Sequence, residues 1–594
     1  MVAALAAVLS TPLRAAAGPL SRTRPGDPGW PTPARWQQLK DQVGDALVPV
    51  RSPLLACTTS HDEAACALLF KSLKNPYFLG DEVGLTQTLG WVDAWTSRPS
   101  VYAVAARNTR DVVAAVNFAR EHNLRLVVKG GGHSYQGTSN APDSLLVWTR
   151  RMNDITLHDA FIASGCERRA SPTRAVTVGA GAIWAQVYDA VTTRGGGYVQ
   201  GGGCTTVGVA GLVQGGGFGS FSKAFGLAAA SLLQAEVVTA DGVVRVCNAC
   251  TNADLFWALK GGGGGSLGVV TRLTLKVHEL PETFGAVNFS VRATSDAAFT
   301  KLVAMAVDLY ASSLMNAHRG EQIRLRGNML QNAMVFQGLT RAEAGAVWRP
   351  FFDALDKAPD DYKLDFSPLK IVSTSAREFW SPTLLKRVFG FIRRDDRPGA
   401  PQTNVFWPGD EGQAAQVLHG YGSTWLPATL LQPAQRPALV GALVAASRHW
   451  GLGVHFNKGL AGASPEVIAA ARDTPVNPAV LDAFALVISG AGEQPAYPGV
   501  AGHEPNAALA RQRRQAVAQT MAELRKLVPN AGSYLSESDY FEADWQRSHW
   551  GANYARLAAV KAMVDPDDLF IVHHGVGSER WSDDGFTRKA MDQG

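Results

Sequence analysis

The spacing of apolar residues between positions 97 and 130 predicts two strands with a helix between them. Residues 101–105 and 124–128 are short apolar runs typical of strands. Between them the pattern follows a helical period, with Thr109 as the expected N-cap. The apolar face of this helix consists of Val112, Val113, Val116 and Ala119. The ordered part of the chain therefore begins with a β-α-β unit.

A second unit follows between residues 175 and 277. Residues 175–178 predict a strand, and 236–246 show the pattern of a hairpin that turns at Asp241-Gly242. A short apolar helix is expected at 255–259, and 272–277 alternate as in a half-buried strand. The helix expected between the first strand and the hairpin has one apolar face, formed by Ile183, Trp184, Val187, Tyr188 and Val191.

The pattern changes beyond Pro281. Strand-like stretches such as 286–291 alternate with helical ones such as 299–310, and we interpret residues 281–530 as a second lobe. The last segment, 531–594, contains a helix at 552–563 with Leu557 and Val560 facing inward. Residues 21–96, rich in Pro and Trp, are predicted to be an irregular N-terminal extension.

Residues 1–20 resemble a secretory signal peptide without its basic start. They combine an apolar run at 2–9 with Arg14 and small residues at 15–18. We therefore expect a secreted or periplasmic protein; a frayed Ala-rich terminus or a misassigned start is the alternative. In an exported chain, Cys57 and Cys66 are expected to form a disulfide.

Cys247 and Cys250 form a CxxC motif with no second pair or nearby His. This favours a loop thiol pair or a disulfide over a zinc site, and no metal is expected. The motif does not reveal the role of Cys166, so the pairing of the cysteines stays open.

Charge and length exclude other classes of protein. The 594 residues carry 56 Lys and Arg against 51 Asp and Glu, a net charge of only +5 without a long basic run, so nucleic-acid binding is not expected. Beyond the first residues no run of 18 apolar residues occurs, so no membrane span is expected either.

Glycine is concentrated in one part of the chain. Of the 60 glycines, 20 lie between residues 195 and 268, and clusters occur at 130–132, 201–203, 215–219 and 261–265. Bare backbone permits positive φ and close approach of a ligand, and successive N–H groups bind anions such as a pyrophosphate. Tight turns in a β-rich core are the alternative for any single cluster. Four clusters together favour a nucleotide cofactor.

Two common nucleotide motifs do not fit these clusters. No Lys follows a cluster in P-loop register, which disfavours NTPase chemistry. Gly263, Gly265 and Gly268 satisfy GxGxxG, but the motif leads into a strand instead of opening a helix.

Residues 128–137 (VKGGGHSYQG) and 202–219 (GGCTTVGVAGLVQGGGFG) together resemble the flavin-binding domain of the vanillyl-alcohol oxidase superfamily, and most closely its berberine bridge enzyme-like branch. Residues 254–270, 550–557 and 564–566 match as well, so the resemblance covers roughly 85–280 and 530–580. It implies an α+β fold: a two-part PCMH-type FAD-binding domain (97–280 and 531–594) with an α+β substrate domain (281–530) inserted between the parts.

The same resemblance implies covalent FAD, attached to His133 at the 8α-methyl and to Cys204 at C6. Imidazole and thiol are both nucleophilic, and each follows a glycine turn. Many branches keep only the histidine, and Thr205 stands where the family often has proline. The other implied cofactor-binding residues are Gly130, Gly131, Gly132, Ser134, Gly137, Thr138, Thr206, Val207, Gly208, Gly211, Gly215, Val270, Asn553 and Tyr554.

The family's base lies in a YxNYxD segment, which here reads Tyr534-Leu-Ser-Glu-Ser-Asp539, a partial match. We predict Tyr534 as the base and Glu537 as an assisting or substrate-orienting group. The reverse order is equally open, because a phenol with a pKa near 10 needs help to ionise and a carboxylate does not. In a strand-like segment the two side chains would point to opposite faces. A surface turn is the alternative for Glu537.

The implied reaction is oxidation of an alcohol or sugar hydroxyl by hydride transfer to the flavin, with release of hydrogen peroxide. Valine at position 207 accompanies oxidase behaviour in the family, which favours molecular oxygen as acceptor. Residues 573–581 resemble the ending of fungal relatives of isoamyl alcohol oxidases. The alternatives are a dehydrogenase with another acceptor, oxidation at a C–N bond, or a catalytically silent flavin-binding protein. The second lobe also contains aromatic residues for which two interpretations stay open, the lining of a substrate pocket or the filling of a core. They are Phe379, Trp380, Trp407, Trp425 and Trp450.

Overall fold

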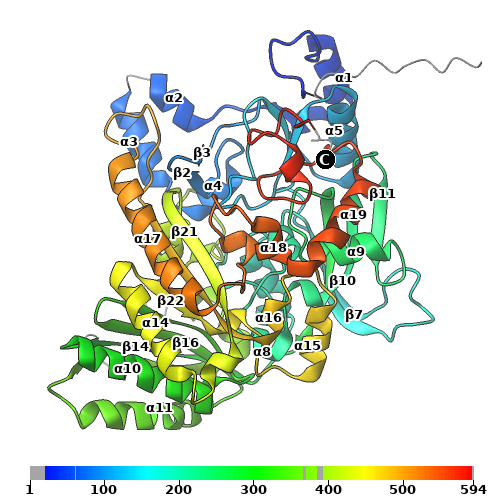
Figure 1. Cartoon of the computed structure of the whole chain (residues 1–594). Coiled ribbons are helices and arrows are strands. Elements are labelled where there is room, and N and C mark those ends of the chain that lie inside the picture. Colours follow the sequence, from blue (N-terminus) through cyan, green and yellow to red (C-terminus); the bar gives the residue numbers. More distant parts are fainter. Residues whose placement is uncertain (1–20, 60–61, 365–369, 384–391, 591–594) are drawn as a thin grey trace, which may run out of the picture.

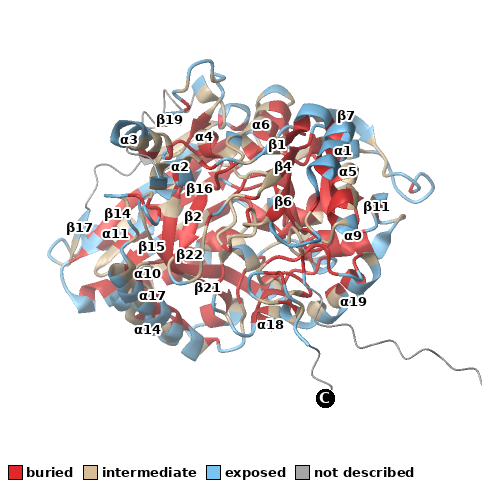
Figure 2. Cartoon of the chain, turned by 90° about the horizontal axis from the view of Figure 1, so that it is seen from above, coloured by how far each residue is buried: buried red, intermediate tan, exposed pale blue. Residues whose placement is uncertain are grey.

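A computed structural model describes residues 21–59, 62–364, 370–383 and 392–590 (Figure 1). The signal peptide expected at 1–20 lies outside these residues. Three sheets of four or more strands occur in the described part of the chain, together with helices that cover them. Figure 2 shows buried strands under helices whose outer faces are exposed. The predicted α+β class is confirmed.

The four-stranded sheet contains the β-α-β unit predicted at the start. Its strands, in order, are β1 (Leu47–Pro49), β4 (Tyr102–Ala105), β6 (Ser144–Trp148) and β5 (Arg125–Lys129). Helix α5 (Thr109–Glu121) connects β4 to β5. Its N-cap is Asn108, not Thr109, because the Asn108 side chain accepts from the N–H groups of Arg110 and Asp111.

The five-stranded sheet is antiparallel and contains the predicted hairpin. Its order is β11 (Val244–Asn248), β10 (Leu232–Val238), β12 (Val269–Lys276), β8 (Thr173–Gly179) and β7 (Ile155–Phe161). The predicted helices are present too, as α6 (Trp184–Tyr188), which continues as a π-helical turn, and α9 (Ala253–Leu259). Helix α7 (Val209–Gln214) follows the second glycine cluster.

A ten-stranded sheet forms the second lobe. Its strands are β17 (Tyr362–Leu364), β14 (Thr283–Ala293), β16 (Met329–Gln337), β15 (Arg319–Arg326), β22 (Leu452–His455), β23 (Ala483–Glu493), β21 (Gln416–Pro427), β2 (Thr88–Trp91) and β3 (Trp95–Thr96), with β18 (Lys370–Ser375) on β14. In Figure 1 the helices α10 (Asp296–Leu309), α11 (Arg341–Asp356), α14 (Arg436–His449) and α17 (Ala507–Leu527) lie on its outer side. The largest apolar core fills the space between this face and the helices.

One helical stretch in the described residues, Asp296–Leu314, is long and apolar enough to cross a membrane. Of its most apolar stretch, 44 % is buried inside the protein. Phe299, Leu302 and Val303 are buried in the core of the second lobe. This packing is typical of a core helix.

The structure corrects the prediction that residues 21–96 are irregular. They form four helices, α1 (Pro33–Val43), α2 (Pro53–Thr59), α3 (Glu63–Ser72) and α4 (Pro76–Asp81), and the strands β1, β2 and β3. Pro33 and Pro76 stand in the first turns of α1 and α4, where proline is tolerated because no intrahelical N–H bond is lost. The prolines therefore mark helix starts. Strand β1 pairs with β4 in the four-stranded sheet and β2 pairs with β21, so the extension joins both lobes.

The C-terminal segment returns to the first lobe. Helix α18 (Trp545–Trp550) and the predicted helix, observed as α19 (Tyr554–Val564), pack against α9 and the five-stranded sheet. Leu557 and Val560 are buried in that core, as predicted. Phe570 pairs with Leu126 beside the four-stranded sheet. The exact domain boundaries stay predictions.

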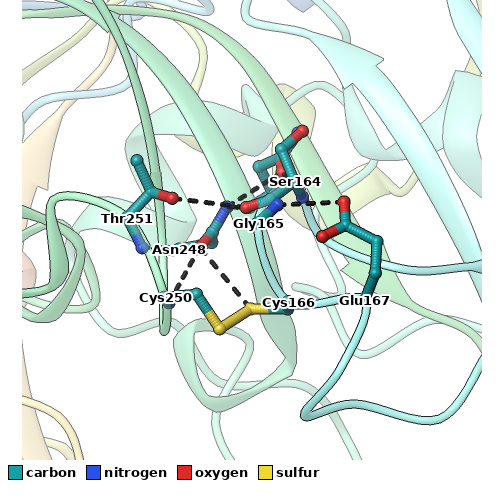
Figure 3. The surroundings of a disulfide bond; sticks show 8 residues. Ser164, Gly165, Cys166, Glu167, Asn248, Cys250 and Thr251 are labelled. Atoms are coloured by element: carbon teal, nitrogen blue, oxygen red, sulfur yellow. Dashed lines mark hydrogen bonds between the residues drawn. A yellow bond between two sulfur atoms is a disulfide. The ribbon is translucent and has the colours of Figure 1, made fainter.

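Two disulfides are present. Cys57–Cys66 confirms the prediction. The pairing left open for the other cysteines is now assigned: Cys250 of the CxxC motif bonds to Cys166, and Cys247 is a buried free thiol. Asn248 explains this arrangement (Figure 3), because its Oδ1 accepts from the backbone N–H of Cys250 at 2.9 Å and its Nδ2 donates to Ser164 O at 2.9 Å. The amide thus holds the loop of Cys250 against that of Cys166.

We expect the C166S/C250S double variant to unfold at lower denaturant concentration than C57S/C66S. The bridged cysteines are 84 and 9 residues apart in sequence. Chain entropy then assigns about 4.5 kcal/mol to the longer loop and about 2.5 kcal/mol to the shorter. Chemical denaturation followed by fluorescence measures both, and equal midpoints for the two variants would contradict this expectation.

Candidate active site

A cavity of about 1430 Å³ lies between the glycine-rich segments and the inner face of the ten-stranded sheet. On one side it is lined by residues from all four glycine clusters, including Gly130–Gly132, Gly201–Gly203, Gly215 and Gly263–Gly265. On the other side, polar residues such as Asn288, Gln331 and Arg324 project from β14, β16 and β15. The sequence clusters therefore meet in one place.

Glycine serves two purposes around this cavity. At Gly203, Gly263 and Gly264 an added Cβ would meet no atom closer than 3.8 Å, so the bare backbone leaves open space for a ligand. At Gly131 a Cβ would lie 2.7 Å from the backbone N of Gly208, so these two segments pack directly on each other. Only part of the glycine excess therefore faces a ligand.

The lining fits the predicted FAD. Ser266 Oγ, Gln136 Oε1 and His574 Nδ1 are buried and lack a hydrogen-bond partner among the described residues. Buried polar atoms are normally paired, so a ligand with donors and acceptors along its length suits this cavity. Small-molecule pockets usually measure about 300–1,000 Å³. This cavity is larger, which leaves room for a dinucleotide and a substrate together.

His133 follows the glycine turn after β5 and faces the cavity. Its Nε2 lies 3.2 Å from Thr206 Oγ1. Burial lowers the pKa of His133 to about 4, so the imidazole is neutral at physiological pH. In the tautomer in which Nε2 donates to Thr206, Nδ1 carries the free lone pair and is the nucleophilic nitrogen.

Cys204 also lines the cavity, directly after Gly203. Burial and the nearby Asp410 carboxylate raise the pKa of its thiol well above the usual value. Asp410 belongs to a segment for which the sequence predicted no role.

Most of the other predicted cofactor residues line the cavity, and four do not. Those that line it are Gly130, Gly131, Gly132, Ser134, Thr138, Val207, Gly208, Gly211, Gly215 and Val270. Gly137 packs instead against Trp95, and Thr206 contacts the His133 imidazole through its Oγ1. Asn553 donates to the carbonyls of Pro475 and Val476, and the Tyr554 hydroxyl donates to Glu579, so both hold the C-terminal segment in place.

Tyr534 and Glu537 both line the cavity, although a strand would separate them. The strand-like assignment is wrong, because Leu535–Glu537 form a 3₁₀ turn that brings both side chains to one side. Ser536 lies close to Gly215, where a Cβ would come within 2.9 Å of its Oγ. The turn therefore packs onto the third glycine cluster.

The two candidate groups differ in their surroundings. Lys458 Nζ donates to both carboxylate oxygens of Glu537, and the two side chains are 13 % and 19 % exposed. The Tyr534 ring packs against Phe218 with 5.0 Å between centroids, and burial raises the pKa of its hydroxyl well above 10. At neutral pH the Tyr534 hydroxyl is therefore protonated, whereas Glu537 forms an ion pair with Lys458.

Several lining residues were missed in the sequence. Lys458 follows β22, Glu321 is in β15, and Tyr135 and Tyr421 pack against each other with ring centroids 5.1 Å apart. No sequence signal connects these positions, because they come from separate strands and loops. Of the aromatic residues left open in the second lobe, Phe379, Trp380, Trp407 and Trp450 line the cavity, whereas Trp425 is 1 % exposed in the core.

Comparisons with known proteins identify an FAD-binding domain and a berberine-like segment in this chain. A family described as "FAD binding domain" matches residues 100–248, and one described as "Berberine and berberine like" matches 533–577. The FAD-linked oxidoreductase malF of Malbranchea aurantiaca is 30 % identical, over 96 % of this chain and 94 % of that protein. The FAD-linked oxidoreductase easE of Arthroderma benhamiae is 33 % identical, over 82 % and 90 %.

Solved structures share the fold. The VAO-type flavoprotein MtVAO615 of Myceliophthora thermophila C1 superposes with a TM-score of 0.78 at 24 % identity, over 96 % of this chain and all of that one. Glucooligosaccharide oxidase of Acremonium strictum, described with a 6-S-cysteinyl, 8α-N1-histidyl FAD, gives 0.62 at 21 % identity, over 81 % and 92 %.

Proposed function

The chain belongs to the FAD-linked oxidoreductases that combine an FAD-binding domain with a berberine-like C-terminal segment, and we propose that it is an oxidase of alcohol or sugar hydroxyl groups. The observation that carries this proposal is the ion pair of Glu537 and Lys458, which faces the same cavity as His133 and Cys204. A proton acceptor thus shares one cavity with the cofactor's predicted attachment points.

Bound FAD supplies a two-electron acceptor. We propose that it is held at both His133 and Cys204. The neutral imidazole of His133 and the position of Cys204 after a glycine turn support this attachment. The glucooligosaccharide oxidase with the same fold is described with the corresponding pair of links.

The chain itself must take the hydroxyl proton of the substrate. A phenol whose pKa is raised by burial is a poor acceptor, which favours Glu537 over Tyr534 for this step. Lys458 orients the Glu537 carboxylate through both oxygens. Tyr534 is then left to donate a hydrogen bond to the substrate. This assignment reverses the order of roles predicted from the sequence.

The substrate side of the cavity suits a polar molecule. Asn288, Gln331, Gln322 and Arg324 line it from neighbouring strands, and Trp407 and Trp450 add aromatic faces. Sugars bind through this combination of hydrogen bonds and apolar ring faces. Val207 lines the cavity as well, and we retain molecular oxygen as the proposed acceptor, with peroxide as product.

We also propose that the protein is exported. Its two disulfides support this, since disulfides persist in oxidising compartments.

A substrate panel tests the function. We expect at least one alcohol or oligosaccharide to bleach the flavin absorbance under anaerobic conditions, and the same compound to yield stoichiometric peroxide in air. Bleaching without peroxide in air would replace the oxidase by a dehydrogenase. Bleaching of the flavin by amines alone would indicate oxidation at a C–N bond. If no compound bleaches the flavin, the protein would be a catalytically silent flavin-binding protein.

A further inference from the structure

The segment from β20 (Val405–Phe406) to α13 (Pro408–Gln413) is docked onto the residues around Cys204. Thr205 Oγ1 donates to Val405 O at 3.1 Å, and Trp407 Nε1 donates to Gly203 O at 3.2 Å. These bonds hold the two segments together on both sides of Cys204, although about 200 residues of sequence separate them.

Asp410 is the acidic group that this docking brings to the sulfur. Its carboxylate interacts with the Cys204 thiol and with the backbone N–H of Thr205. Asp410 Oδ2 also accepts from Trp407 N at 3.4 Å, which fixes the side chain within its own turn. The carboxylate is therefore oriented towards Cys204 from both segments.

The electrostatics of this pair create a chemical problem for Cys204. The nucleophile in thioether formation is the thiolate, but burial and Asp410 both raise the pKa of this thiol. Burial also raises the pKa of Asp410 to about 6, which makes it a stronger base than an exposed carboxylate. A thiol that ionises reluctantly thus lies beside a proton acceptor that is still ionised at neutral pH.

We propose that Asp410 is the general base that accepts the Cys204 proton when the sulfur bonds to the flavin. The inference rests on the proposed attachment of FAD at Cys204. In this step Sγ gives its proton to the Asp410 carboxylate and forms a bond to ring carbon C6. The hydrogen of C6 leaves as a proton, and the electron pair of the C6–H bond passes through the ring to dioxygen, which takes up this pair and the two protons released from Sγ and C6 to become hydrogen peroxide.

The other titratable groups near this pair do not compete with Asp410 between pH 5 and 9. Burial raises the pKa values of Tyr135 and Tyr77 above their ordinary value of 10, so both stay neutral. His133, with a pKa of about 4, is neutral as well. Glu411 on the same helix is paired with Arg393 at 2.6 Å. Thioether formation is therefore expected to slow as the pH falls through about 6, where Asp410 becomes protonated.

Peptide mass spectrometry of the purified holoenzyme tests the proposal. We expect wild type to carry FAD on both the His133 and Cys204 peptides, and D410N to carry it on His133, with the Cys204 link formed about 100-fold more slowly. The asparagine can still accept from Trp407, so the turn is retained. E411Q is the matched control on the same helix and is expected to behave like wild type.

A second measurement separates proton transfer from a merely structural role. On incubation of D410N holoenzyme in air, the Cys204 link is expected to form faster as the pH rises from 7 to 10, because hydroxide replaces the missing base. D410E is expected to restore the link at neutral pH. Complete Cys204 linkage in freshly purified D410N, or a slow rate that does not change with pH, would overturn the role of Asp410. Absence of the link from wild type would instead overturn the proposed attachment at Cys204.

Discussion

Replacement of Glu537 by Gln is expected to slow reduction of the bound flavin by an alcohol substrate about 100- to 1,000-fold, the usual contribution of a general base. The amide keeps the size of the side chain but does not accept a proton, and it loses the ion pair with Lys458. Anaerobic stopped-flow spectroscopy of flavin bleaching measures this rate directly, because it isolates the reductive step from reaction with oxygen.

Two further variants serve as controls for E537Q. D539N removes a carboxylate two residues away that does not line the cavity and is expected to leave the rate near that of wild type. Y534F is expected to lower the rate of flavin reduction less than E537Q does. The Tyr534 phenol stays protonated, so its removal costs a hydrogen bond to the substrate but no proton acceptor. A normal rate in E537Q together with a large loss in Y534F would restore Tyr534 as the base.

Replacement of both His133 and Cys204 by Ala is expected to release all FAD on acid denaturation. Wild-type protein should precipitate yellow, because two covalent links survive unfolding, whereas the double variant should give a colourless pellet and a fluorescent supernatant. Absorbance of the two fractions at the flavin band measures the outcome. Each single variant is expected to keep its flavin through the remaining link.

The matched control is C247S. Cys247 is the other free cysteine in the described part of the chain, but it is buried in the core of the five-stranded sheet, away from the cavity. Its replacement should leave the precipitate yellow. A colourless wild-type precipitate would contradict covalent attachment altogether.

Local patterns predicted the first lobe well. The strands and helix around Val112, the hairpin at Asp241-Gly242 and the helix before Gly261 all occur where they were expected. Each of these elements has its own apolar period or turn signal within about twelve residues, so neighbouring side chains suffice to specify it. The N-terminal extension was mispredicted, because its helices and strands are stabilised largely by distant parts of the chain, such as β21.

The site residues likewise fall into those that a local motif predicts and those that distant segments contribute. His133 and Cys204 were predicted as attachment points because each directly follows a glycine cluster. Backbone that approaches a ligand closely requires glycine, so such positions are visible in the local sequence. The partner of each catalytic candidate was not identified, because Lys458 reaches Glu537 from a loop 79 residues earlier. Asp410 likewise reaches Cys204 from a helix about 200 residues away.

The sequence by itself determined the cofactor, the α+β class and the two residues expected to hold the flavin, since these depend on motifs whose members are neighbours in the chain. Only the tertiary structure decided which glycines face a ligand and which pack on each other, that Cys250 pairs with Cys166, and that Tyr534 and Glu537 face one cavity. The physical reason is that burial and charge pairing, which set the pKa values and protonation of these side chains, arise from segments that meet only when the two lobes pack together.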